Sequence, residues 1–208
     1  MVEIILILSL AIIFIILLRK LPEVKLDSDS SIMSTVPTTA TVPPVVTSVP
    51  ASGGRIIELW KKAEAEFEKK NLSKAEKLYL KIAALDPKNP KIYGKLGIIY
   101  LEQKNYLDAR EAFGEAVKRE SNNALWYNNL GLVLYNLKRF SESVEAYKKS
   151  LAIDNSKAVR FFNLGLVYEA MGESQKALEA YERAASLEPE NVEFQNLIIR
   201  IKEEIKKK

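Results

Sequence analysis

The hexapeptide NNLGLV at residues 128–133 returns almost unchanged as FNLGLV at residues 162–167. The two copies are 34 residues apart, and each lies in an apolar stretch that ends in polar residues. Self-similarity at a period of this size indicates an array of small structural units, none of which buries its own apolar face alone. This period therefore divides the chain before any other feature does.

Stepping by 34 residues gives four windows, which are residues 56–89, 90–123, 124–157 and 158–191. Spacings of three and four between apolar residues predict two amphipathic helices in each window. Small residues recur where the two helices would approach each other, and large rings recur beside them. The core residues expected from this pattern are Tyr93, Leu96, Gly97, Ala109, Phe113, Tyr127, Leu130, Gly131, Tyr147, Phe161, Leu164, Gly165, Ala177 and Tyr181.

Turn residues agree with helix starts at these windows. Asn89 precedes Pro90, a pair typical of a helix N-cap and first helical residue, and Asn123 and Asn191 recur at the same offset. The tetrapeptide SKAE, beginning at Ser73, has the form of a capping box. Local turn signals and the global period therefore predict the same boundaries.

The first helix of the first window departs from the pattern. Lys62 and Glu66 occupy offsets that are apolar in the other windows. One interpretation is a degenerate terminal helix, as is common at the end of a repeat array. The other is a one-residue slip of register, which would place Trp60, Ala63 and Phe67 in the core.

The recurring aromatic, Leu-Gly, Tyr and Ala positions resemble those of the tetratricopeptide repeat, over residues 56–191. The resemblance implies an all-α fold, an α–α superhelix of four helix–turn–helix repeats closed by a cap helix at residues 192–208. It also implies a concave groove lined by the first helix of each repeat, which binds a protein or peptide and needs no cofactor. The residues that would face this groove are Trp60, Glu64, Ile98, Leu101, Asn128, Leu132, Tyr135, Phe162, Leu166 and Glu169.

Ile98, Leu132 and Leu166 are apolar at one groove offset, so we expect a ladder that receives an apolar segment of the partner. The alternative is that this ladder packs against neighbouring helices. Part of the family grips C-terminal carboxylates with Lys and Asn residues, of which only Asn129 is present here, and this disfavours such ligands. The acidic rim expected around the ladder, which would favour basic flanks in the partner, consists of Glu64, Glu68, Glu102 and Glu169.

Residues 2–20 are mostly apolar and predict a transmembrane helix. Glu3 precedes the apolar run, whereas Arg19 and Lys20 follow it, so the positive-inside rule places the repeats on the cytoplasmic side of a single-pass membrane protein. A cleaved signal peptide would need a basic start and a small-residue cleavage site, and neither is present.

Residues 21–54 contain five of the eight prolines, many Ser and Thr residues and no aromatic residue. Such a segment buries too little apolar surface to offset its ordering entropy, so we expect a disordered linker with a reach of roughly 30 Å. The alternative is an O-glycosylated stalk, which requires the opposite, extracytoplasmic topology.

Composition argues against most enzymatic functions. The chain has no Cys and no His, so the common zinc sites and imidazole-based catalytic pairs are excluded. A net charge of +4 from 31 basic and 27 acidic residues does not indicate nucleic acid as a partner. The sequence therefore predicts a non-catalytic scaffold without catalytic or metal-binding residues. A self-assembling structural membrane protein is the competing hypothesis.

Overall fold

The computed structural model describes residues 51–207, so the predicted transmembrane helix at residues 2–20 and nearly all of the predicted linker lie outside it. This described range is all-α and contains no strand. None of its helices is both long and apolar enough to span a bilayer. The helices are α2 (Ala51–Glu68), α3 (Leu72–Leu85), α4 (Pro90–Glu102), α5 (Tyr106–Arg119), α6 (Ala124–Asn136), α7 (Phe140–Ile153), α8 (Ala158–Ala170), α9 (Ser174–Leu187) and α10 (Val192–Lys206).

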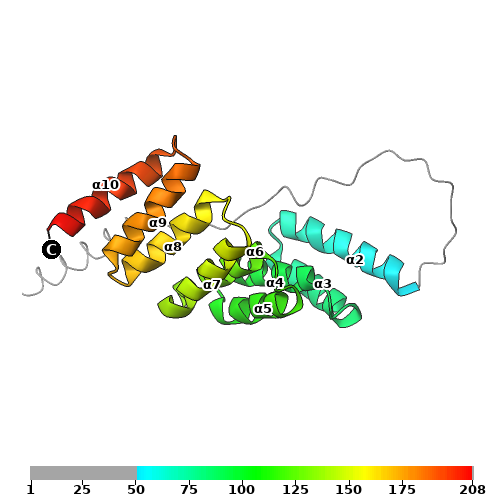
Figure 1. Cartoon of the computed structure of the whole chain (residues 1–208). Helices are drawn as coiled ribbons and strands as arrows, with labels where there is room; N and C mark the ends of the chain where they lie inside the picture. Colours follow the sequence, from blue (N-terminus) through cyan, green and yellow to red (C-terminus); the bar gives the residue numbers. More distant parts are fainter. Residues whose placement is uncertain (1–50, 208) are drawn as a thin grey trace, which may run out of the picture.

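Each helix packs against the next one in the chain, and the helices form an elongated array (Figure 1). The cyan helix α2 lies at one end and the red helix α10 at the other. The all-α solenoid expected from the sequence is therefore confirmed. Because no helix pair closes back on an earlier one, each pair buries its apolar stripe only against its neighbours.

The 34-residue period also appears in the backbone conformation. One residue in the left-handed region ends the first helix of each pair: Lys70, Lys104 and Lys138 at φ 59° and Gly172 at φ 75°. These four turns are equally spaced from the first pair to the fourth, so the register of the first helix does not slip. The short connection needs a positive φ, which only glycine adopts without cost.

Helix α2 nevertheless places Trp60, Ala63 and Phe67 on the core side. Ala63 is buried, and the Trp60 ring meets the Tyr79 ring edge-on at 5.5 Å between centroids. These residues have the ordinary spacing of three and four within an unslipped helix. The helix therefore keeps the register of the first interpretation and places the residues named by the second one on the core side. Lys62 is exposed and pairs with Glu58 at 2.6 Å.

The start of α2 differs from the sequence expectation. The helix begins at Ala51, whereas the linker was expected to continue through residue 54. Gly53 and Gly54 are weak helix formers, but the residues after them are not. Once those are helical, each residue added at the N-terminus gains a hydrogen bond without a new nucleation step.

The asparagine caps are confirmed. The Oδ1 atoms of Asn89, Asn123 and Asn191 accept hydrogen bonds from the backbone N–H two residues later, at 3.1, 3.0 and 3.1 Å. The predicted capping box at Ser73 is wrong. Helix α3 already begins at Leu72, which makes Ser73 an internal residue of the first turn.

Glycine in the first helix permits close contact with the ring of the second helix. A Cβ atom on Gly97 would lie 2.8 Å from the Phe113 ring, and one on Gly165 would lie 2.4 Å from the Tyr181 ring. Both distances are below van der Waals contact, so these positions accept no side chain. The predicted core residues that are buried are Leu96, Gly97, Ala109, Phe113, Gly131, Tyr147, Leu164, Gly165, Ala177 and Tyr181.

Four predicted core residues, Tyr93, Tyr127, Leu130 and Phe161, are only half-buried. The three aromatic rings among them, those of Tyr93, Tyr127 and Phe161, each have a basic side chain of the second helix over the ring. The Arg119 guanidinium is 3.9 Å from the Tyr93 ring centroid. An edge ring beneath a cation gains a cation–π contact in place of full burial.

Helix α10 closes the array. Its apolar stripe, which includes Phe194 and Ile201, is buried against the preceding pair. Ile199 stands at the offset that glycine holds in α4, α6 and α8, and it is 58% exposed. No helix of the described range covers this face, so α10 has the position of a first helix without a second.

Candidate docking site on the inner layer

The first helices of successive pairs pack directly on one another, and we call α2, α4, α6, α8 and α10 the inner layer. The Trp126 ring lies against the backbone of Gly94, and the Phe162 and Phe194 rings are 5.5 Å apart. Helices α6 and α8 also contact each other. The repeat resemblance implied a groove on this layer, so its exposed side is the candidate docking site.

A polar cluster lies at the N-terminal end of the inner layer. Glu64 of α2 accepts a hydrogen bond from the Tyr79 hydroxyl at 2.6 Å and from Lys95 Nζ at 3.1 Å. The Lys95 ammonium also lies 5.5 Å from the centre of the Phe67 ring. Burial, with the hydrogen bond to Glu64, raises the pKa of Tyr79 far above its ordinary value. The hydroxyl therefore stays a neutral donor.

A second polar cluster lies towards the C-terminal end. Glu169 of α8 accepts from the Tyr181 hydroxyl at 2.8 Å and from the Arg200 guanidinium at 2.9 Å. Burial is the largest cause that raises the pKa of Tyr181, and the charge of Glu169 adds to it. Both clusters join a carboxylate, a tyrosine of the second helix of the same pair and a base of the next helix of the inner layer.

The bases of these clusters, Lys95 and Arg200, were not predicted from the sequence. In each cluster the base follows the carboxylate by 31 residues, from Glu64 to Lys95 and from Glu169 to Arg200. This recurring separation was the available signal.

The middle of the inner layer has no such cluster. Phe113 takes the place of the tyrosine in the second repeat, so no hydroxyl is present there. Tyr147 of the third repeat is fully buried, and its hydroxyl has no hydrogen-bond partner among residues 51–207. Burial raises its pKa well above the ordinary value, with a smaller contribution from Tyr135.

Four of the predicted groove residues are buried inside the array. Leu132 and Leu166 are each 4% exposed, and Phe162 and Asn128 are 0% exposed. The apolar ladder expected to receive a partner is thus largely covered by its own neighbours. The physical reason is that adjacent first helices pack side by side, with Asn163 Nδ2 donating to Asn128 Oδ1 at 3.4 Å.

Three predicted groove residues, Ile98, Leu101 and Tyr135, remain half-exposed, and we call them the central strip. Ile98 and Leu101 lie over the core of the second repeat, and Tyr135 lies over the core of the third and fourth. The strip thus lies between the two polar clusters. The side chains of the strip are apolar or aromatic. The repeat positions that they occupy hold no charged residue in α4 or in α6.

The acidic rim is mostly neutralised. Glu64 and Glu169 belong to the polar clusters, and Glu102 accepts from Lys70 at 3.0 Å. Only Glu68 of the four rim carboxylates is without an ion-pair partner in the part of the chain that the structure describes. The expectation of a partner with basic flanks therefore loses its support.

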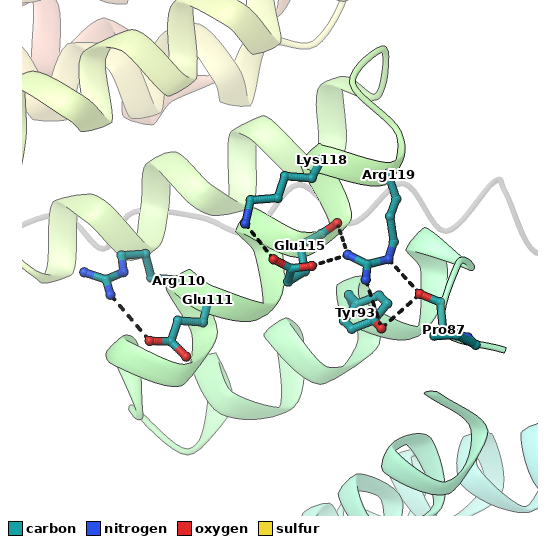
Figure 2. A network of polar contacts seen from close by, with 7 residues as sticks. All are labelled: Pro87, Tyr93, Arg110, Glu111, Glu115, Lys118 and Arg119. Atoms are coloured by element: carbon teal, nitrogen blue, oxygen red, sulfur yellow. Dashed lines mark hydrogen bonds and ion pairs between the residues drawn. The ribbon is translucent and has the colours of Figure 1, made fainter. Parts of the chain in front are cut away.

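The edge of the second repeat is held by a polar network (Figure 2). The Arg119 guanidinium donates to the Pro87 carbonyl at 2.8 Å and to the Tyr93 hydroxyl at 3.2 Å, which ties α4, α5 and the preceding turn together. Hydrogen bonds from Arg119, and then Lys118, lower the pKa of Glu115 to about 2. This network fixes the helix that carries Ile98 and Leu101.

A hollow of about 590 Å³ lies outside the inner layer, between α5 and α7. Three bases and three carboxylates rim it, and they pair with one another along their own helices. Among residues 51–207, no group of three or more metal-binding side chains is placed to hold an ion.

This geometry defines a class of protein, an α-helical repeat array with an accessible strip on its inner layer. Models of the tetratricopeptide repeat match residues 78–111, 95–158 and 158–191. Together these matches run without a gap over more than half of the chain. The chain therefore belongs to the tetratricopeptide repeat family.

Solved structures share the fold. A crystal structure of MamA is 28% identical, with a TM-score of 0.66 over 68% of this chain and 82% of MamA. A form of MamA from Desulfovibrio magneticus RS-1 is 18% identical, with a TM-score of 0.67 over 76% of this chain and 94% of its own. YrrB, described as a TPR protein with an unusual peptide-binding site, is 18% identical, with a TM-score of 0.63 over 73% of this chain and 81% of YrrB. No curated protein sequence matches the chain.

Proposed function

We propose that this chain is a membrane-anchored, non-catalytic docking protein, whose repeats hold a short apolar segment of another protein against the central strip. The observation that carries the proposal is the half-exposed strip of Ile98, Leu101 and Tyr135 between two ion-paired clusters. An apolar strip on a solvent-facing layer favours an apolar ligand, and paired ends limit how far that ligand extends.

The membrane anchor and the cytoplasmic placement of the repeats belong to this proposal. They rest on the apolar residues 2–20 and on the basic residues that follow them. Lysine modification by a membrane-impermeant reagent in intact cells tests the topology. Protected repeat lysines, which become reactive after lysis, are the expected result. Modification of Lys104 and Lys138 in intact cells would contradict a cytoplasmic array.

The docking site is tested by substitution of an exposed strip residue in the full chain. Ile98→Lys should remove most neighbours identified by proximity labelling in the native membrane, because a charge on the strip opposes apolar docking. Leu132 is a poorer target, since its burial would confuse lost binding with lost folding. Leu107→Lys, on the outer side of α5, is the matched control and should leave the neighbours unchanged. An unaltered set of neighbours in the Ile98 variant argues against the site.

One observation favours the second candidate, self-assembly. Val192 and Ile199 of the terminal helix α10 are 68% and 58% exposed. A second copy packed on α10 would cover both side chains. The sedimentation mass of the detergent-solubilised chain separates the candidates, since a monomer supports recruitment of other proteins and a stable oligomer supports self-assembly.

A further inference from the structure

A basic hollow opens between α2 and α3, at the N-terminal end of the array. It has a volume of about 470 Å³. Ala65 and Leu78 lie at its base, and the only carboxylate in its lining is Glu66. The lysines around it, which we call the basic face, are Lys62, Lys69, Lys74 and Lys77.

The charges of the basic face are not balanced within it. Glu66 Oε1 lies 3.7 Å from Lys69, and its Oε2 lies 4.0 Å from Lys74, so one carboxylate is shared loosely between two ammonium groups. Glu66 also accepts a hydrogen bond from Asn71 at 2.9 Å. Lys62 pairs with Glu58, outside the lining, at 2.6 Å, whereas Lys77 has no ion-pair partner among residues 51–207. The hollow between α5 and α7 differs, because its three bases and three carboxylates cancel.

The chemistry of the basic face fits a charged surface better than one small ligand. All its bases are lysines, whose ammonium groups act as flexible point charges, and it contains no arginine to grip a phosphate with two hydrogen bonds. Lys69 and Lys74 side chains are 66% and 74% exposed, so both ammonium groups are accessible from outside. Several exposed lysines on one face are typical of attraction to anionic headgroups.

The place of this face in the chain indicates which surface it meets. It lies on the first helix pair, which follows directly after the predicted linker and the predicted transmembrane helix at residues 2–20. A tether with a reach of roughly 30 Å keeps this end of the array close to the bilayer. The fourth repeat has six acidic and three basic residues, so this part of the array opposes the same surface, whereas the far end itself is formed by α10.

We propose that the basic face docks on the anionic headgroups of the membrane that holds the chain, and so orients the array with its α2–α3 end on the bilayer. This inference rests on the membrane anchor of the proposed function. Docking leaves the central strip open, because the strip lies on α4 and α6. Each lysine near an anionic surface strengthens attraction about fivefold, and the effect falls away beyond a Debye length.

The test uses the full chain in lipid nanodiscs, either neutral or one-third phosphatidylserine, with acylation rates of single lysines measured by mass spectrometry. Lys69, Lys74 and Lys77 should react at least about fivefold more slowly in anionic discs, and high salt should abolish the difference. Lys104 and Lys138, in turns of other repeats, are internal controls with equal rates. Equal rates for all lysines would overturn the proposal.

Variants sharpen the result. The triple change Lys69→Gln, Lys74→Gln and Lys77→Gln should remove the protection of the neighbouring Lys62. A matched triple of exposed lysines from other repeats should preserve that protection. The control substitutions are Lys104→Gln, Lys138→Gln and Lys148→Gln.

Two further comparisons distinguish a wrong membrane anchor from a wrong docking surface, and an anionic membrane from an acidic protein. If the chain does not associate with neutral discs, the anchor itself is wrong and orientation by this face falls with it. If the chain inserts but shows no lysine protection, only the docking is wrong. Polyglutamate added to neutral discs asks whether an acidic protein is the partner. Protection by polyglutamate but not by anionic lipid would overturn the membrane assignment.

Discussion

The end repeats and the middle repeats place an aromatic ring beneath the first helix in the same way, but the rings differ in their polar contacts. In the first and fourth repeats the ring beneath the first helix is a tyrosine that donates to Glu64 or Glu169. In the second repeat that ring is Phe113, and in the third it is Tyr147 with an unpaired hydroxyl. Every repeat thus has an aromatic ring at this position, whereas only the first and fourth repeats pair its hydroxyl with a carboxylate.

The difference explains why the accessible apolar strip lies in the middle of the inner layer. A tyrosine hydroxyl that reaches a carboxylate brings charge to the inner layer, and the carboxylate then requires a base from the next repeat. Where the hydroxyl is absent or unpaired, the same offsets hold Ile98, Leu101 and Tyr135. Substitutions that exchange these features between repeats therefore test the comparison.

Gly165→Ala should have the largest effect on stability. The new Cβ atom would lie 2.4 Å from the Tyr181 ring, whose displacement also disturbs the bond to Glu169. We expect a loss of about 2–3 kcal/mol in the free energy of unfolding, measured by urea denaturation. Gly131→Ala should cost less, since its clash begins at 2.9 Å and Tyr147 has no bond to lose. A larger loss at Gly131 would contradict the comparison.

Gly114→Ala is the control for helix propensity. A Cβ atom there meets nothing within 4 Å, so the substitution should stabilise α5 by up to about 1 kcal/mol. Loss of stability in this variant would mean that glycine itself, and not the ring contact, is what these helices need.

Asp154→Asn should have the second largest effect and should depend on pH. The first helix of the fourth repeat lacks an asparagine cap, and the Arg160 side chain, 2% exposed, pairs with Asp154 instead. Hydrogen bonds from Arg160 and then Ser156 lower the pKa of Asp154. The pair therefore stabilises the fold above the ordinary carboxyl pKa of about 3.9 and is lost as pH falls through the lower folded pKa.

We expect a cost of about 1–2 kcal/mol at pH 7, since the Asp154 carboxylate is partly open to water. The cost should shrink as the pH falls below about 4, measured by urea denaturation across the pH range. A cost that is equal at pH 7 and pH 2 would show that the carboxylate charge is not the cause.

Tyr181→Phe and Tyr147→Phe should differ in sign. The first removes a hydrogen bond to a charged carboxylate and should cost about 1.5 kcal/mol. The second removes a buried hydroxyl without a partner, so stability should stay equal or rise by up to about 1 kcal/mol. Chemical denaturation of both variants and of the parent chain measures the pair. Equal losses would mean that Tyr147 is satisfied by a buried water.

Lys138→Gly should have the smallest effect. Lys138 adopts φ 59° at a turn where the fourth repeat has Gly172 at φ 75°. Glycine relieves the left-handed strain of about 1–2 kcal/mol but increases the entropy of the unfolded chain, so we expect a net gain of about 0.5 kcal/mol. Lys138→Ala keeps the strain and should give no gain. A stabilised alanine variant would show that relief of backbone strain is not the cause of the gain.

Much of the fold could be read from local signals. The caps at Asn89, Asn123 and Asn191 use a side chain and a backbone N–H two residues apart, so a short sequence contains the whole interaction. The capping box at Ser73 was wrong because the N-cap is Asn71, two residues earlier, and the four letters SKAE do not exclude that earlier start. Single boundaries are thus less certain than the period.

The candidate site was only partly predictable. The sequence around Leu132 and Leu166 does not tell whether a partner or a neighbouring helix covers these side chains. Only the packing of the helices shows that both are 4% exposed. The pairs Glu64–Lys95 and Glu169–Arg200 join residues of different repeats, and the rotation between repeats decides which offsets meet.

The sequence by itself determined the 34-residue plan, the helix pairs and the small residues beneath the rings, because these depend on spacing within one or two turns of helix. Only the tertiary structure decided which inner residues stay open, which carboxylates are neutralised and where the lysines of the first pair gather. Those outcomes depend on how far each helix is rotated against the next, a quantity that no short stretch of the chain contains.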